Sequence, residues 1–293
     1  IFDFERVDDV LASAEPVPRR GRVQRVVGSM LVVDLPRLEL GQHVAIQRPR
    51  RTLRGEVVGF EGRRALVMPF ASPNGVAAGM VVESQPRSDR VLVGEAFIGR
   101  TIDPFGVPLD GGPPIKSGRQ RPLQRVAPNP MQRRPITDPL PVGVRVIDGL
   151  CTLGAGQRVG IFAGSGVGKS TLLGMMARNA DCDCVVIGLV GERGREVREF
   201  VERDLGPEGR ARSAVVVATS DRSPLLRMRA AEYAVALAED LRSQGKKVLF
   251  LMDSVTRYAQ ARREVGLAAG EPPATRGFPP SVFAAIPALM ERL

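Results

Sequence analysis

Between residues 158 and 267, four short apolar runs alternate with four longer stretches that have the composition of helices. The apolar runs are 158–162, 184–190, 213–219 and 247–253, and the stretches that follow them are 168–179, 195–206, 223–245 and 255–267. Apolar runs without polar alternation are typical of strands that are buried on both faces. The alternation therefore predicts an α/β fold with a parallel sheet that is covered by helices on both sides.

The N-terminal part has a different pattern. From about residue 21 to 95, short apolar runs are separated by Gly, Pro, Asn and Arg, which is typical of a small all-β sheet or barrel without helices. Residues 99–143 are rich in Pro and Gly and predict an extended connector that packs on its neighbours. We therefore expect an N-terminal segment over 1–20, a β-barrel domain over 21–95 and an α/β domain over 96–293.

Composition excludes several classes of protein. The 293 residues are 43% apolar and 25% charged, as in ordinary soluble domains. No run reaches the roughly 18 apolar residues of a membrane-spanning helix, and the N-terminus is acidic where a signal peptide would be basic. The three cysteines lack the spacing of a zinc site, and the only histidine, His43, is expected to pack or lie at the surface. Because the sequence has neither a spanning run nor a signal peptide, we expect a cytoplasmic location.

The net charge of +10 raises the question of nucleic-acid binding. Affinity for phosphates needs clustered charge, and the basic residues here are spread along the chain. The sequence contains no Trp and only two Tyr residues, so base-stacking platforms are scarce. We therefore expect no nucleic-acid partner. The positive net charge would allow weak contact with an acidic membrane surface.

The stretch "AGSGVGKST" over 163–171 joins the first predicted strand to the first predicted helix. Glycines in such a loop let successive N–H groups point at a phosphate beside a helix N-terminus. Lys169 would bind the β- and γ-phosphates, and Ser170 would offer its hydroxyl to Mg²⁺. Ala163 replaces the first glycine of the usual pattern at small cost. The predicted nucleotide-binding residues are Gly164, Ser165, Gly166, Val167, Gly168, Lys169, Ser170 and Thr171.

Two further strands end in acidic residues that belong at the same edge of the sheet. Asp253 ends the run 247–253 and is predicted to hold Mg²⁺ together with Ser170. Glu192 follows the run 184–190 and is predicted to orient the water that attacks the γ-phosphorus. Arg193 and Arg257 are candidates for contacts with phosphate oxygens. The predicted catalytic residues are Glu192, Lys169, Arg193 and Arg257, with ATP and Mg²⁺ as cofactors.

Several longer segments resemble one family. "GRTIDPFGVPLDGGPPI", "GQRVGIFAGSGVGKSTLLGMMAR", "GLVGERGREVREF", "LMDSVTRYAQARRE" and "GEPPATRGFPPSVFA" are similar to the flagellar protein-export ATPases. These are type III secretion ATPases, which are related to the α and β subunits of rotary ATP synthases. The resemblance implies a β-barrel followed by a RecA-like ATPase domain. It also implies a helical domain that would follow residue 293, and an arginine supplied by a neighbouring subunit. We expect the chain to be part of a longer polypeptide.

The resemblance also implies function and partners. The expected activity is ATP hydrolysis that drives protein export through a flagellar type III secretion apparatus. The expected partners are five further copies in a homo-hexamer, export gate, stalk and regulator proteins, and export substrates with their chaperones. The expected place is the cytoplasmic face of the inner membrane. Alternatives are an injectisome ATPase, a rotary ATP synthase subunit and an RNA-translocating hexamer.

Overall fold

The computed structural model describes residues 18–86, 89–164 and 166–293, which form two compact units. One unit contains the described residues up to Asp89 together with 222–225 and 261–282, and the other contains the remaining described residues. Residues 1–17 of the predicted N-terminal segment lie outside the described residues. The domain boundaries expected from the sequence stay predictions.

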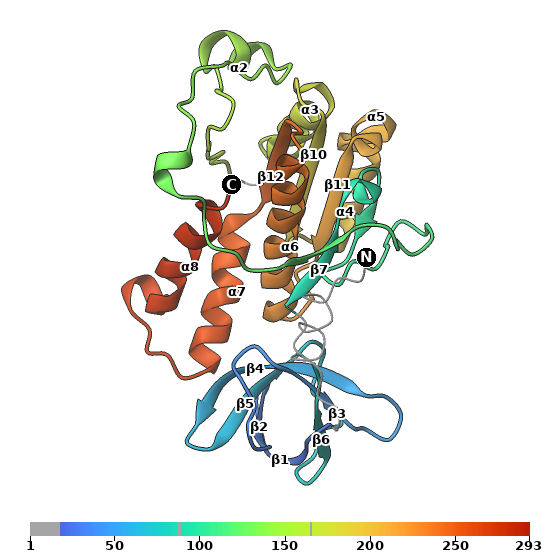
Figure 1. The fold of residues 1–293 in the computed structure, drawn as a ribbon, viewed down its shortest axis with the longest axis vertical. Helices are drawn as coiled ribbons and strands as arrows, with labels where there is room; N and C mark the ends of the chain where they lie inside the picture. Colours follow the sequence, from blue (N-terminus) through green and yellow to red (C-terminus); the bar gives the residue numbers. More distant parts are fainter. Residues whose placement is uncertain (1–17, 87–88, 165) are drawn as a thin grey trace, which may run out of the picture. The chain divides into compact units, whose positions relative to one another are not determined.

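The N-terminal strands form a closed antiparallel barrel (Figure 1). They are β1 (Arg20–Val27), β2 (Met30–Asp34), β3 (His43–Ile46), β4 (Leu53–Glu61), β5 (Arg64–Pro69) and β6 (Val81–Ser84), in the order β1-β2-β5-β4-β3-β6. Aliphatic side chains fill the interior, among them Val23, Leu31, Val44 and Val67. Closure pairs every strand with two neighbours, so no free edge remains. The predicted all-β barrel is confirmed.

His43 is a packing residue of this barrel. Its side chain is buried, and its ring meets the ring of Phe70 edge-on with 5.1 Å between centroids. Its Nε2 lies 3.5 Å from a carboxylate oxygen of Glu56. These contacts account for the buried position of the histidine.

The second unit is built on a parallel sheet with the order β12-β10-β11-β8. Its strands are β8 (Thr101–Ile102), β10 (Cys184–Val190), β11 (Ser213–Ala218) and β12 (Val248–Asp253). Alternate residues of β10 enter two different hydrophobic clusters, with Val186 on one face and Val185 on the other. Both faces are therefore buried, as the sequence predicts.

Helices cover the two faces. The α-helices are α2 (Arg145–Leu150), α3 (Lys169–Asn179), α4 (Gly194–Glu199), α5 (Gly206–Ala211), α6 (Pro224–Ser243), α7 (Val255–Ala268) and α8 (Pro280–Met290). Single turns are η1 (Glu95–Phe97), η2 (Pro130–Gln132), the π-turn η3 (Phe200–Asp204) and η4 (Thr275–Gly277). Apolar residues of α6 pack on one face of the sheet, and those of α3 and η3 pack on the other. No helix among the described residues is long and apolar enough to cross a membrane.

Three expectations differ from the structure. The run 158–162 forms no strand: Val159 and Phe162 are exposed, and the Phe162 ring lies against Gly160, in the space that a Cβ would need. Four glycines between 154 and 164 weaken strand formation there. The connector is also more ordered than predicted, since it supplies β8 to the main sheet and β9 (Arg119–Pro122) as partner of β7 (Arg90–Val93). The sequence predicts one helix over 195–206, whereas the structure has three consecutive segments there: α4, the π-turn η3 and α5.

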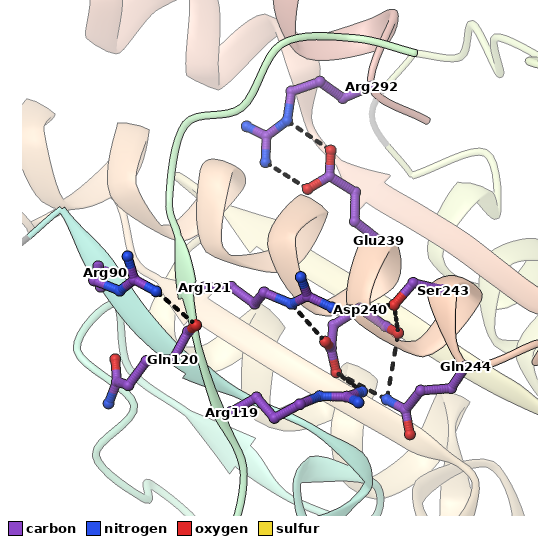
Figure 2. A network of polar contacts seen from close by, with 9 residues as sticks. All are labelled: Arg90, Arg119, Gln120, Arg121, Glu239, Asp240, Ser243, Gln244 and Arg292. Atoms are coloured by element: carbon purple, nitrogen blue, oxygen red, sulfur yellow. Dashed lines mark hydrogen bonds and ion pairs between the residues drawn. The ribbon is translucent and has the colours of Figure 1, made fainter. Parts of the chain in front are cut away.

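Two consecutive acidic residues near the end of α6 hold distant parts of the chain (Figure 2). The carboxylate of Glu239 accepts two hydrogen bonds of 2.9 Å from Arg292, and both side chains are almost fully buried. The fully buried carboxylate of Asp240 pairs with Arg119 at 3.1 Å and with Arg121 at 3.0 Å. Helix α6 is thereby bound to the end of the chain on one side and to β9 on the other.

The buried pair predicts a measurable loss of stability. Replacing Glu239 by Gln keeps the shape but leaves the buried Arg292 guanidinium without its counter-charge, which costs about 3–5 kcal/mol of unfolding free energy. Urea unfolding measures the difference. Glu202→Gln is the control: its ion pair with Arg198 is exposed, so the change should stay within about 0.5 kcal/mol. Equal effects of the two substitutions would contradict the assignment.

Candidate functional site

The glycine-rich loop ends at the N-terminus of α3. Gly166 and Gly168 have φ values of +77° and +97°, which favour glycine. Helix α3 begins at Lys169, and the N–H of Leu172 donates to the carbonyl of Gly168 at 2.9 Å. The loop therefore presents backbone to solvent at a helix N-terminus, where an anion is stabilised. Ser165 lies outside the described residues.

Lys169 meets the acidic end of β12. Its Nζ lies 2.6 Å from Oδ1 of Asp253, whose side chain is 9% exposed. The fold thus brings together two residues that are far apart in the sequence and that the motifs place at one site. A lysine and a carboxylate at this edge of a sheet are the groups that a metal-bound triphosphate needs.

Glu192 lies at the end of the neighbouring strand, β10. The backbone around it is held from both sides: the N–H of Gly191 donates to the carbonyl of Ala218 at 2.7 Å, and the N–H of Ser220 donates to the carbonyl of Glu192 at 3.0 Å. On the other side, the N–H of Ser254 donates to the carbonyl of Val190 at 3.3 Å. Glu192 is therefore fixed at the same sheet edge as Asp253.

The surroundings of Glu192 favour its protonated form. Burial raises the pKa of this carboxyl from an ordinary 4.5 to about 7, helped by the negative charge of Asp253 and by a hydrogen bond to Glu196, while Lys169 opposes the shift. A carboxyl with a pKa near 7 is suited to accept a proton at neutral pH. The sequence analysis did not single out Glu196 as part of this group.

This shift predicts a pH dependence of stability. The native protein holds a proton on Glu192 between pH 4.5 and about 7, where the unfolded chain has lost it, so the contribution of this group to stability falls as pH rises through that range. Glu192→Gln removes the contribution. In urea unfolding, the stability of the wild-type protein relative to the Gln variant should be lower at pH 8 than at pH 5. A constant difference would contradict the raised pKa.

The remaining predicted residues lie at or near this edge and contact other parts of the chain or solvent. Arg193 is exposed and pairs with Glu196 at 2.9 Å. The guanidinium of Arg257, on α7, bonds Gln260 at 3.2 Å. Ser170 and Thr171 are exposed in the first turn of α3, and Val167 is exposed in the loop. Their roles stay predictions.

Two family models match the chain. One is the nucleotide-binding domain of the ATP synthase alpha/beta family, over residues 143–293, and the other is the β-barrel domain of the same family, over residues 23–85. The chain belongs to the ATP synthase alpha/beta family. The first match contains every residue of the candidate site, and the second contains β2 to β6 and most of β1.

Similar members of this family carry names that refer to the flagellum and to the type 3 secretion system. The chain is 50% identical over 287 residues to a "Flagellum-specific ATP synthase" of Bacillus subtilis, covering 97% of this chain and 66% of the relative. It is 53% identical over 276 residues to a "Type 3 secretion system ATPase" of Xanthomonas euvesicatoria, covering 94% and 62%. It therefore spans about two thirds of the length of these relatives.

A solved structure has the same fold. The assembled ATPase EscN of the enteropathogenic E. coli type III secretion system superposes with a TM-score of 0.86 at 43% identity, covering 93% of this chain and 66% of that one. The predicted combination of a β-barrel with an α/β nucleotide-binding domain is thereby confirmed, and so is the resemblance to the flagellar and type III secretion ATPases.

Proposed function

We propose that this protein hydrolyses ATP to drive protein export through a flagellar type III secretion apparatus. The observation that carries the proposal is the 2.6 Å contact between Lys169 and Asp253, with Glu192 two residues beyond the end of the adjacent strand β10. This arrangement supports the proposal, because a cation for phosphates, an oxygen ligand for a metal and a candidate base would then lie at one edge of the sheet. Relatives named "Flagellum-specific ATP synthase" support the flagellar role.

Mg²⁺ fits the donor set of the site. Among the described residues no group of three or more His, Cys, Asp or Glu side chains is placed to hold a metal. Mg²⁺ needs no such group, because it uses one or two protein oxygens together with phosphate oxygens and water. Asp253 and the hydroxyl of Ser170 or Thr171 would hold it, and the bound ion would neutralise charge on the phosphates.

The residues of the site have distinct proposed roles in ATP hydrolysis. The glycine-rich loop and Lys169 would bind and orient the phosphates, since a helix N-terminus and a positive charge both stabilise an anion. Glu192 accepts the proton of the attacking water, for which its raised pKa is suited. Arg193 and Arg257 would lie against phosphate oxygens in the reactive complex.

We further propose a homo-hexamer in which a neighbouring subunit completes each site. The structures of EscN describe an assembled ATPase and its complex with a central stalk, EscO, and the present fold is the same. An arginine from a neighbour contributes about 10³ to 10⁵ in rate in related reactions. The proposed partners are the stalk, export gate and regulator proteins, with export substrates and chaperones, at the cytoplasmic face of the inner membrane.

An injectisome ATPase is the second candidate, favoured by the 53% identity to the Xanthomonas type 3 secretion ATPase.

Two assays separate these candidate functions. Phosphate release from Mg-ATP by the natural full-length protein, rising steeply with protein concentration, supports an oligomeric ATPase, and no release refutes it. Deletion of the gene should abolish filament assembly. Loss of effector secretion with intact filaments would favour the injectisome, and stimulation by poly(C) would favour an RNA translocase.

A further inference from the structure

Gly191 lies between the last residue of β10 and Glu192. Its φ is +75°, in the left-handed region where a residue with a side chain is strained. The residue is buried, although a buried glycine by itself carries no function. What distinguishes Gly191 is the group that occupies the space beside it.

That space is taken by the aliphatic stem of Arg257. A Cβ built on Gly191 would lie 2.7 Å from Cβ, 3.0 Å from Cγ and 3.3 Å from Cδ of Arg257. Ordinary carbon contacts are about 3.5–4.0 Å, so one side would have to move by up to about 1 Å. Because the contacts include the Cβ and Cγ atoms, rotating the far end of the side chain does not relieve the clash.

The backbone at Gly191 has little freedom to move away. Three hydrogen bonds fix it. The N–H of Gly191 donates to the carbonyl of Ala218, and the carbonyls of Glu192 and Val190 accept from the N–H groups of Ser220 and Ser254. The first two bonds lead to the β11 side and the third to the β12 side. A side chain at position 191 would therefore push Arg257 rather than the strand.

We propose that Gly191 is a positioning residue of the hydrolytic site: by leaving room for the Arg257 stem, it holds Arg257 at a fixed place against the backbone that carries Glu192. The inference rests on the proposed function, since it gives Gly191 a part in the same reaction. Gly191 touches no reacting atom in this scheme and acts through Arg257 and Glu192. Its substitution should therefore affect the chemical step more than nucleotide binding.

The test is Gly191→Ala in the natural full-length protein. We expect kcat to fall about 10²-fold, the loss that follows a displacement near 1 Å, while the Kd for a fluorescent Mg-nucleotide stays within about threefold. Gly194→Ala is the matched control, because a Cβ on Gly194 meets nothing within 4 Å. It should change neither quantity by more than about twofold.

A double-mutant cycle separates the Arg257 contact from backbone strain. In an Arg257→Gly background the stem is gone, so adding Gly191→Ala should reduce kcat by less than about threefold further. Should Gly191→Ala alone fail to fold, recovery of folded protein in the Arg257→Gly background supports the proposal, and failure of both overturns it. Additive losses in kcat also overturn it.

The outcomes distinguish this inference from the function on which it rests. No hydrolysis by the wild-type protein refutes both. Hydrolysis by the wild-type protein with an unchanged kcat in Gly191→Ala refutes the positioning role alone. A loss of nucleotide affinity as large as the loss of kcat would show that Gly191 supports the binding loop instead, and would likewise overturn it.

Discussion

Replacing Lys169 by Ala is expected to weaken Mg-nucleotide binding by about 10²-fold or more. The substitution removes the positive charge that would meet the phosphates, and it leaves the carboxylate of Asp253, 9% exposed, without the partner now 2.6 Å away. Losing a buried charged contact between protein and ligand costs about 2–5 kcal/mol of binding free energy, and 1.4 kcal/mol corresponds to a tenfold change in Kd. Titration with a fluorescent nucleotide measures the change.

The control is Lys247→Ala. Lys247 pairs with Asp181 at 2.9 Å, and both side chains are exposed, so nucleotide affinity should be unchanged. Affinity in the Lys169→Ala protein within about threefold of the wild type would show that the nucleotide binds elsewhere. That result would refute the site and not merely the part played by one residue.

Replacing Glu192 by Gln is expected to abolish hydrolysis while nucleotide stays bound. The amide has the shape of the carboxyl but cannot accept a proton, and loss of a general base costs about 10²- to 10⁴-fold in rate. Because burial already favours the neutral form of Glu192, the neutral amide should not destabilise the fold. The loss is then a loss of chemistry, measured by single-turnover hydrolysis of radiolabelled ATP.

Glu199→Gln tests the specificity of that result. Glu199 is an exposed residue of α4 that pairs with Arg195 one helical turn away, so its rate should match the wild type. Hydrolysis at the wild-type rate by the Glu192→Gln protein would show that another group activates the water. Glu196, which shares a hydrogen bond with Glu192, would then be the next residue to substitute.

Sequence patterns predicted the centre of the fold well. Strands β10 and β11 match the predicted runs to within a residue, because a run of apolar residues bounded by polar ones has few alternatives. The two acidic residues at one sheet edge followed from the same pattern. Since parallel strands end together, placing β10 beside β12 pairs Leu189 with Asp253, and Glu192 follows within three residues.

Other parts could not be predicted because they depend on tertiary contacts. Strand β8 has two residues, Thr101 and Ile102, which is too short for any periodicity to appear. The run 158–162 has the composition of a strand, yet the structure forms none there. In the sequence, only the glycines around it argue against a strand. The hydrogen bond between Glu192 and Glu196 requires the turn between β10 and α4, and spacing along a helix carries no information about that turn.

The consecutive acids of α6 restrict how that helix can evolve. Each residue of an α-helix advances by about 100° around the axis, so one residue gained or lost upstream of Glu239 would turn both carboxylates away from their arginines at once. Substitutions along α6 can be absorbed one by one, whereas a change in its length breaks two unrelated attachments in a single event. We therefore expect the number of residues from Pro224 to Asp240 to be invariant among natural variants, even where the residues between them differ.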